Sequence, residues 1–339
     1  MKRVSLKDIA KKVGVSPSTV SFVLNGKGTK MRISERVAEK IRKVAESEGY
    51  HPNQLAVGLR TGHTKTLGLI VENISNSFFS HLAKIIEDEA QNYGYRIVYC
   101  STENDLSRAR DLIRMLSQRQ VDGYLITPTE GLEEDIQKLV KLGKPVVLMD
   151  RYFPELNVPS VVVDNYNGAG KGVKHLLDKG YKKIGFVGIQ MDLIQMQQRE
   201  KAYVDVLQSK GIRVQKKYIL KLRYNSENSE EAINKISAFI TGNKDLEAIF
   251  FVTNYLGIYG LESIRRLGLT IPNDLAMVCF DDHDIFRLYP PGITTIEQPV
   301  EEIATTAIQL LMDQLKKTKS VHKKKQVQIA AKLNERGST

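Results

Sequence analysis

The chain has 339 residues, of which 42% are hydrophobic and 26% charged, with two cysteines and no tryptophan. This length predicts two or three domains, and this composition is typical of a folded soluble protein rather than a disordered one. Two distant cysteines cannot stabilise so long a chain through disulfide bonds, and they cannot form a four-ligand zinc site. No apolar stretch approaches the roughly 18 residues that a membrane span needs, and no secretory leader is expected. A cytoplasmic protein is favoured, and a membrane protein or disulfide scaffold is excluded.

The positive charge is concentrated at one end of the chain. Residues 1–62 carry 13 Lys and Arg against five Asp and Glu, a net charge of +8, whereas the other 277 residues carry only +3. A small basic segment joined to a nearly neutral body is expected when one end of a protein meets a polyanion. A solvated basic surface is the alternative that charge alone leaves open.

Three short helices are expected in the first fifty residues. Ser5-Leu6-Lys7-Asp8 fits a capping box, and the helix that it opens can end at Gly14. Ser16 and Pro17 fit the N-cap and first position of a second helix, and a third helix opens at Ser34. Two short helices joined by a tight turn predict a helix-turn-helix, with a simple helical packing module as the alternative.

The second of these helices carries side chains that suit DNA. Hydroxyls and amides can bond phosphate oxygens and base edges, and an aromatic edge can pack against a thymine methyl group. Such a helix lies in the major groove, with its N-terminal half against the bases. The expected DNA contacts of this region are Ser5, Ser16, Pro17, Ser18, Thr19, Ser21, Phe22, Asn25 and Arg32.

From Leu6 to Gly62 the chain resembles the headpiece of the lactose and galactose repressor family of bacterial transcription factors. The matching stretches are Asp8–Ser16, Thr19–Ser21, Val23–Asn25 and Gly49–Asn53, followed by Ala56 and Leu59. In that family the segment after Pro-Asn is a hinge helix that orders on operator DNA. The resemblance implies that Asn53 contacts the DNA backbone, Ala56 lies in the minor groove and Leu59 is a wedge in the central base step.

The expected hinge helix is short. A helix of about eight residues is too short to be stable alone in water, so the hinge is expected to fold only on DNA. An ordinary polar linker is the alternative.

At the positions from which family members read bases, this chain has Pro17, Ser18 and Phe22. Pro17 has no N–H to donate, so base reading falls on Ser18, Phe22 and Arg32.

From Thr64 onward, apolar strands alternate with amphipathic helices, which predicts parallel sheets covered on both faces. The pattern occurs twice, which predicts two lobes with a ligand cleft beyond the carboxyl ends of their strands. Neither a dinucleotide-binding turn nor a phosphate-binding loop is present, and no catalytic or metal-ligand spacing is found. We therefore expect no enzyme, no metal and no cofactor. The predicted strands are 67–71, 96–100, 123–127, 145–149, 160–163, 183–187, 216–220, 248–252 and 276–280.

Polar pairs follow four of these strands and indicate where a ligand binds. Carboxylates and amides at strand ends can share hydrogen bonds with hydroxyls, which suits sugars and similar polyols. A helix cap or turn residue is the plain alternative for any single one of them. The pairs are Asp150-Arg151, Asp164-Asn165, Thr253-Asn254 and Asp281-Asp282.

The family resemblance continues over almost the whole chain, through stretches such as Ile74–Phe79, Pro145–Arg151 and Thr294–Pro299. It implies a body similar to a periplasmic sugar-binding protein, with Asp164 and Asp282 as structural or interlobe residues. The cleft residues that it implies are Phe78, Phe79, Asp150, Arg199, Asn254 and Asp281.

These observations predict an α/β protein: a small all-α helix-turn-helix headpiece, then a two-lobed periplasmic-binding-protein-like body of parallel sheets flanked by helices. The expected divisions are 1–50 for the headpiece, 51–63 for the hinge and 64–339 for the body. Within the body, lobe one is expected to comprise 64–161 and 293–322, and lobe two 162–292 and 323–339.

The predicted function is that of a repressor, a homodimer on double-stranded operator DNA whose affinity is set by a small molecule between the lobes. A sugar is favoured as this effector. A nucleobase effector, or a sugar-binding transport protein, is the alternative.

Overall fold

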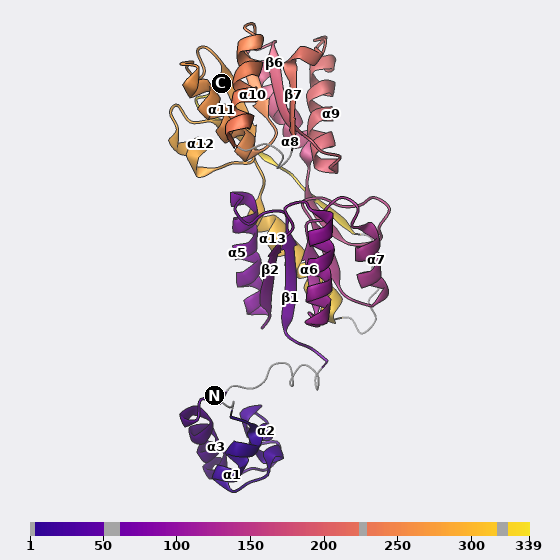
Figure 1. Cartoon of the computed structure of the whole chain (residues 1–339), viewed down its shortest axis with the longest axis vertical. Helices are drawn as coiled ribbons and strands as arrows, with labels where there is room; N and C mark the ends of the chain where they lie inside the picture. Colours follow the sequence, from indigo (N-terminus) through magenta and orange to yellow (C-terminus); the bar gives the residue numbers. More distant parts are fainter. Residues whose placement is uncertain (1–3, 51–61, 224–228, 317–324) are drawn as a thin grey trace. The chain divides into compact units, whose positions relative to one another are not determined.

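The computed structural model describes residues 4–50, 62–223, 229–316 and 325–339, and the chain forms two compact units, Met1–Thr64 and Lys65–Thr339 (Figure 1). The expected hinge residues Asn53, Ala56 and Leu59 lie outside the described residues. The two units are described separately below.

The first unit consists of α1 (Leu6–Val13), α2 (Pro17–Leu24) and α3 (Glu35–Ser47). The predicted capping box is confirmed: Ser5 N donates to the Asp8 carboxylate at 2.8 Å, and Asp8 N donates to Ser5 Oγ at 3.4 Å. The residue after α1 is Gly14, whose φ of +83° suits glycine. Ile9, Val20 and Ile41 are fully buried and join the three helices into one small core. The predicted helix-turn-helix is therefore present.

The first lobe of the body contains a sheet of strand order β11-β5-β4-β3-β1-β2. Side chains of β1 alternate between its faces, because Leu67, Leu69 and Val71 join one core cluster and Ile70 joins another. Helices α5 and α13 cover the first face, and α6 and α7 the second (Figure 1). The elements are β1 (Thr66–Val71), α5 (Ser77–Asn92), β2 (Arg96–Ser101), α6 (Leu106–Gln118), β3 (Gly123–Ile126), α7 (Glu133–Lys141), β4 (Val146–Met149), β5 (Ser160–Val163), α13 (Val300–Lys316) and β11 (Gln326–Ile329).

The second lobe repeats this plan with a sheet of order β12-β10-β9-β8-β6-β7, parallel except for β12, which pairs antiparallel with β10. The third strand in each order, β4 and β9, therefore occupies an equivalent place. The elements are α8 (Asn165–Asp178), β6 (Ile184–Gln190), α9 (Ile194–Ser209), a 3-10 turn (Lys216–Tyr218), β7 (Ile219–Arg223), α10 (Ser229–Gly242), β8 (Ala248–Phe251), α11 (Asn254–Arg266), β9 (Ala276–Phe280), α12 (Asp284–Leu288), β10 (Thr294–Glu297) and β12 (Lys332–Asn334).

The chain crosses between the lobes three times. The first crossover joins β5 to α8 at Asp164, the second joins β10 to α13 through Gln298 and Pro299, and the third joins β11 to β12 through residues 330–331. The crossovers can be followed between the two lobes in Figure 1. Each lobe is thus built from separate stretches of sequence.

Three predicted assignments are wrong. Residues 294–297, expected in lobe one, form β10 and pair with β9 of the second sheet, whereas 326–329, expected in lobe two, form β11 and pair with β5 of the first. Short strands without strong periodicity do not reveal which sheet they join. The strand expected at 216–220 begins only at Ile219, because Lys216–Tyr218 forms a 3-10 turn.

Helix α8 packs very closely against the second sheet at Gly172. A Cβ atom at this position would lie 2.8 Å from Phe250 Cε2 and 3.3 Å from Ile296 Cγ1 and Val278 Cγ1. We therefore predict that Gly172→Ala destabilises the body by about 1–3 kcal/mol, as overpacking of a core does. Gly170→Ala in the same helix is the control, because its Cβ would meet only Val206 Cγ2 at 3.6 Å. Urea unfolding of both variants checks this, and equal stabilities would contradict it.

Candidate functional site

The cleft between the lobes holds two adjoining compartments that share Glu72, Asn76, Ile189 and Tyr255 in their walls. The outer compartment has a volume of about 300 Å³, at the lower end of cavities that hold small ligands. The inner compartment has about 40 Å³, enough for only a few water molecules in this arrangement of the lobes.

Arg151 occupies the first-lobe side of the inner compartment. Its Nε donates to Asp150 Oδ2 at 2.9 Å, its Nη1 donates to Asn104 Oδ1 at 3.1 Å, and its Nη2 forms a short ion pair with Glu72. Its side chain is only 4% exposed. Burial lowers the pKa of Arg151, but the charges of Glu72 and Asp150 outweigh burial and raise it. The guanidinium therefore stays charged and ties together the ends of β1 and β4.

Arg199, on α9, occupies the second-lobe side. Its Nε donates to Asn165 Oδ1 at 2.8 Å and its Nη1 to the carbonyl oxygen of Val252 at 2.6 Å. Its guanidinium lies 3.6 Å from the centre of the Phe280 ring and 3.8 Å from Asp281 Oδ2. Burial lowers the pKa of Arg199 and raises that of Asp281, and in both cases the partner's opposite charge only partly offsets it. Gln298 Nε2 donates to Asp281 Oδ1 at 2.6 Å.

Asp150 and Asp281 have the same unusual backbone conformation. Asp150 directly follows β4 with φ +67°, and Asp281 directly follows β9 with φ +70°. This left-handed region costs a residue with a side chain free energy, and such residues cluster at functional sites. The two lobes therefore present matching carboxylates from equivalent strand ends to one cleft.

Four buried polar atoms around the inner compartment lack a hydrogen-bond partner among the described residues. They are Asn104 Nδ2, Gln195 Oε1, Thr253 Oγ1 and Gln298 Oε1. Buried polar groups are nearly always paired, so unpaired atoms gathered at one cavity indicate that water or a polar ligand occupies it. The set includes a donor, two acceptors and a hydroxyl that can act as either.

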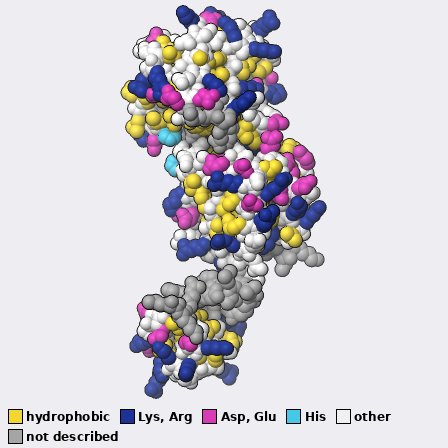
Figure 2. All heavy atoms as spheres, viewed as in Figure 1, with side chains coloured by type: hydrophobic (Ala, Val, Ile, Leu, Met, Phe, Trp, Pro, Cys, Tyr) yellow, Lys and Arg dark blue, Asp and Glu magenta, His cyan; other side chains and the backbone are white. Residues whose placement is uncertain are grey.

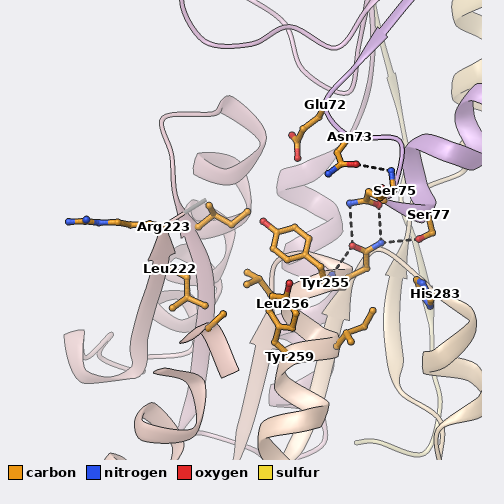
Figure 3. A pocket seen from close by; sticks show the side chains of 15 residues that line it. Glu72, Asn73, Ser75, Ser77, Leu222, Arg223, Tyr255, Leu256, Tyr259 and His283 are labelled. Carbon is orange, nitrogen blue, oxygen red and sulfur yellow. Dashed lines mark hydrogen bonds between the residues drawn. The ribbon is translucent and has the colours of Figure 1, made fainter. Parts of the chain in front are cut away.

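Side-chain amides join the two lobes across the cleft. Asn254 Nδ2, at the start of α11, donates to Asn76 Oδ1 at 3.2 Å and to Ser77 Oγ at 3.1 Å, both at the start of α5. Gln195 Nε2, on α9, donates to Asp150 Oδ2 at 3.3 Å. Figure 3 shows the outer compartment, with a dashed line at the hydrogen bond to Ser77; Tyr255 points toward Glu72, and Arg223 extends away from the other lining side chains.

The structure brings most of the predicted cleft residues together. Asn254 lines the outer compartment, and the inner compartment is lined by Phe78, Phe79, Asp150, Arg199 and Asp281. Asp164 instead caps α8, and Asp282 pairs with Arg336 at 2.6 Å; of the two expected roles, structural or interlobe, these contacts favour the structural one. Arg151 was expected only as the partner of Asp150 in a strand-end pair, and the contributions of Glu72, Asn104, Gln195 and Gln298 were not predicted. Arg151 could be noticed because it follows the strand-end carboxylate Asp150, and Gln298 because it lies in Thr294–Pro299, a stretch that resembles the family. The other three carried no such signal.

The residues expected to contact DNA lie on and around α2. Ser5 and Ser16 cap α1 and α2 through their hydroxyl oxygens, and Asn25 Nδ2 donates to the carbonyl oxygen of Ser21 at 2.6 Å. Ser18 and Arg32 are exposed, and Phe22 is half-buried. The remaining expected residues, Pro17, Thr19 and Ser21, belong to α2 itself. Figure 2 shows Lys and Arg side chains around the visible face of this unit.

No helix among the described residues is long and apolar enough to cross a membrane. In the same part of the chain, no group of three or more His, Cys, Asp or Glu side chains could hold a metal ion.

A helix-turn-helix unit followed by a two-lobed α/β body with a polar cleft defines a class of protein: the ligand-controlled DNA-binding regulator. Residues 5–53 match the lacI family of bacterial regulatory proteins, and residues 173–339 match the periplasmic binding protein-like domain. Catabolite control protein A of Priestia megaterium is 31% identical over 315 residues, 93% of each chain. The transcriptional repressor PurR of Photobacterium profundum is 30% identical over 316 residues, 92% of each chain.

The chain therefore belongs to the lacI family, and it is a DNA-binding transcriptional regulator controlled by a small molecule, as the repressors of that family are. The fold agrees over the whole chain. The lac repressor dimer bound to operator and the anti-inducer ONPF is 19% identical with a TM-score of 0.84, covering 100% of this chain and 99% of that one.

The Arg151 network leads to a prediction about stability. Arg151→Ala leaves the buried carboxylate of Asp150 and the partly buried one of Glu72 without their cation, so we expect a loss of about 3–5 kcal/mol in the free energy of unfolding. The matched control is Arg110→Ala, which breaks an exposed 2.9 Å pair with Asp135 and should cost less than about 1 kcal/mol. Urea denaturation measures both values, and similar losses in the two variants would contradict the assignment.

Proposed function

We propose that this protein is a repressor that binds a two-fold symmetric operator as a homodimer, and that a neutral sugar bound between the lobes controls its operator affinity. The observation that carries the proposal is the set of unpaired buried polar atoms around Asp150 and Asp281. Paired headpieces on one duplex require a dimer, because each helix-turn-helix reads one half-site.

The chemistry of the inner compartment favours a sugar that reaches into it from the adjoining outer compartment of about 300 Å³. A sugar hydroxyl both donates and accepts, so it can satisfy carboxylates, the Asn104 amide N–H and the unpaired Gln oxygens together. The compartment has three carboxylates (Glu72, Asp150, Asp281) against two guanidiniums (Arg151, Arg199). This leaves no surplus positive charge for a phosphate, which supports a neutral polyol.

A nucleobase effector is the second candidate, and the aromatic geometry disfavours it. The rings of Phe78 and Phe79 are 5.0 Å apart but inclined at 72° to each other. Two rings at this angle cannot both stack on one planar base, whereas their edges and faces can pack against the apolar side of a sugar ring.

We propose a binding role for the cleft rather than a catalytic one, because its charged groups are engaged with one another. Arg151 pairs with Asp150 and Glu72, and Arg199 lies against Asp281. A sugar-transport role is disfavoured by the headpiece.

In the headpiece, we assign base reading to Ser18, Phe22 and Arg32, and backbone positioning to the helix-cap residues. The proposed hinge contacts of Asn53, Ala56 and Leu59 rest on the sequence resemblance, because these residues lie outside the described part of the chain.

Asp281 provides the test of the effector site. Asp281→Asn keeps the size of the side chain and tolerates the left-handed backbone, but it removes a charged acceptor, so sugar affinity should fall at least about tenfold. Binding is measured as the thermal shift caused by D-ribose, D-xylose, D-fructose, D-glucose, adenine and guanine. The DNA probe is a duplex that the full-length protein selects from a pool of random sequences, called the enriched duplex below. Without sugar, Asp281→Asn should bind this duplex as tightly as the unmodified protein does.

Asp284→Ala is the control, because Asp284 is exposed on α12 and pairs only with the nearby Arg287 among the contacts of this helix. A shift caused by a nucleobase and by no sugar would overturn the sugar assignment. An undiminished sugar shift in Asp281→Asn would remove Asp281 from the site.

The headpiece charge leads to a prediction about salt. Affinity for the enriched duplex should fall steeply as salt rises, because cations on phosphates release counterions. Lys30→Ala, which removes an exposed cation from the loop after α2, should weaken binding and lower the slope of log affinity against log salt by about one. Lys210→Ala, an exposed cation of the second lobe, should leave the slope unchanged. A salt profile that is flat for the unmodified protein would contradict DNA binding through the basic headpiece.

A further inference from the structure

The arginine and the aspartate on the second-lobe side of the cleft are each hydrogen-bonded to a segment where the chain crosses between lobes. Arg199 Nε donates to Asn165 Oδ1 at 2.8 Å, and Asn165 directly follows the first crossover. Asp281 Oδ1 accepts from Gln298 Nε2 at 2.6 Å, and Gln298 belongs to the second crossover. The proposed effector site is therefore in direct contact with two of the three segments that must bend when the lobes move.

Asn165 makes side-chain hydrogen bonds to two different parts of the body, α9 and the end of β5. Its Oδ1 accepts from Arg199, and its Nδ2 donates to the carbonyl oxygen of Val163 at 3.1 Å, the last residue of β5. Asn165 is only 2% exposed, so neither bond can be exchanged for one to bulk water without cost. One side chain thus links the cleft arginine to the backbone of the first lobe's sheet across the first crossover.

The first crossover is bonded in turn to the third. Asp164 N donates to the carbonyl oxygen of Ile329 at 2.7 Å, at the end of β11. Lys171 Nζ, further along α8, donates to the carbonyl oxygen of Ala331 at 2.8 Å. A change in the direction of the first crossover is therefore transmitted to the backbone of the third.

We propose that Asn165 is a positioning residue that couples effector occupancy at Arg199 to the angle between the lobes, and so to operator affinity. This inference rests on the proposed function. A ligand that hydrogen-bonds to Arg199 or Asp281 redirects the guanidinium, and the Asn165 side chain carries that change to the Val163 carbonyl and the crossover. A ligand shifts such an equilibrium only through contacts that differ between the two arrangements, and the proposal requires the Arg199–Asn165 bond to be one of them.

Three variants separate the coupling role from a role in folding or ligand affinity. Asn165→Ala removes both hydrogen bonds. Asn165→Asp keeps an acceptor for Arg199 but has no N–H to donate to the Val163 carbonyl. Lys174→Ala is the control, because Lys174 lies in the same helix and is exposed.

The experiment measures two quantities in the full-length protein. One is the affinity for whichever of D-ribose, D-xylose, D-fructose and D-glucose gives the largest thermal shift. The other is the ratio of the Kd for the enriched duplex with saturating sugar to the Kd without it. The unmodified protein should show a ratio that differs from one by about fivefold or more.

We expect Asn165→Asp to bind the sugar within about threefold of the unmodified protein while its ratio moves to nearly one. In Asn165→Ala the ratio should also move to nearly one, and in Lys174→Ala both the sugar affinity and the ratio should stay unchanged. The proposal is overturned if Asn165→Asp retains the full ratio at saturating sugar, or if both Asn165 variants lose sugar affinity but recover the full ratio at saturation. The second result would show that Asn165 only shapes the pocket.

If none of the four sugars binds the unmodified protein, the sugar assignment fails and the coupling is judged separately. Arg199→Lys removes the Nε that bonds to Asn165, so amide hydrogen exchange should become faster in peptides covering residues 160–168 and 326–334. Arg110→Lys, remote from the crossovers in its contacts, is the control. Unchanged exchange in both peptides of Arg199→Lys would overturn the coupling.

Discussion

Each lobe of the body depends on one buried arginine that bridges the carboxyl ends of parallel strands. Arg151 holds the strand ends of the first sheet through Asp150, Glu72 and Asn104. Arg199 contacts Val252 after β8 and Asp281 after β9 of the second sheet, and it also bonds to Asn165 at the start of α8. Burying a charge is tolerable only when it is paired and hydrogen-bonded, so each guanidinium also fixes the positions of its partners.

This arrangement explains why the cleft is polar although the strands beneath it are apolar. Parallel strands bury both faces, so their ends are the only places where polar side chains can gather toward a ligand. Asp150 and Asp281 leave their strands in the left-handed region, which turns both carboxylates to the same cavity. The cavity combines charged groups that satisfy one another with neutral groups, such as Thr253 Oγ1, that have no partner in the described chain.

Much of this could be predicted from the sequence, because periodicity and caps are local signals. The capping box at Ser5 and the apolar strands followed by polar pairs depend only on neighbouring residues. The lobes to which β10 and β11 belong were predicted wrongly. A four-residue strand can pair with either sheet, and only tertiary contacts determine which sheet it joins.

The cleft could be predicted only in part, because only some of its residues are marked by local signals. Asp150 and Asp281 lie at strand ends that the pattern reveals, and the resemblance supplied Arg199. Glu72, Asn104 and Gln195 join the site through hydrogen bonds between residues 45 to 79 positions apart, which no local pattern encodes.

The crossovers have a consequence for how the protein is made. The first sheet receives its edge strand, β11, only after residue 329 has been synthesised, and α13, which covers one face of that sheet, begins at Val300. The three-helix unit is complete by about residue 50 and has its own core. Because chains grow from the N-terminus at roughly 5–20 residues per second, the helix-turn-helix has many seconds in which to fold before either lobe can close. A growing chain therefore carries a folded helix-turn-helix before it carries the part that responds to a ligand.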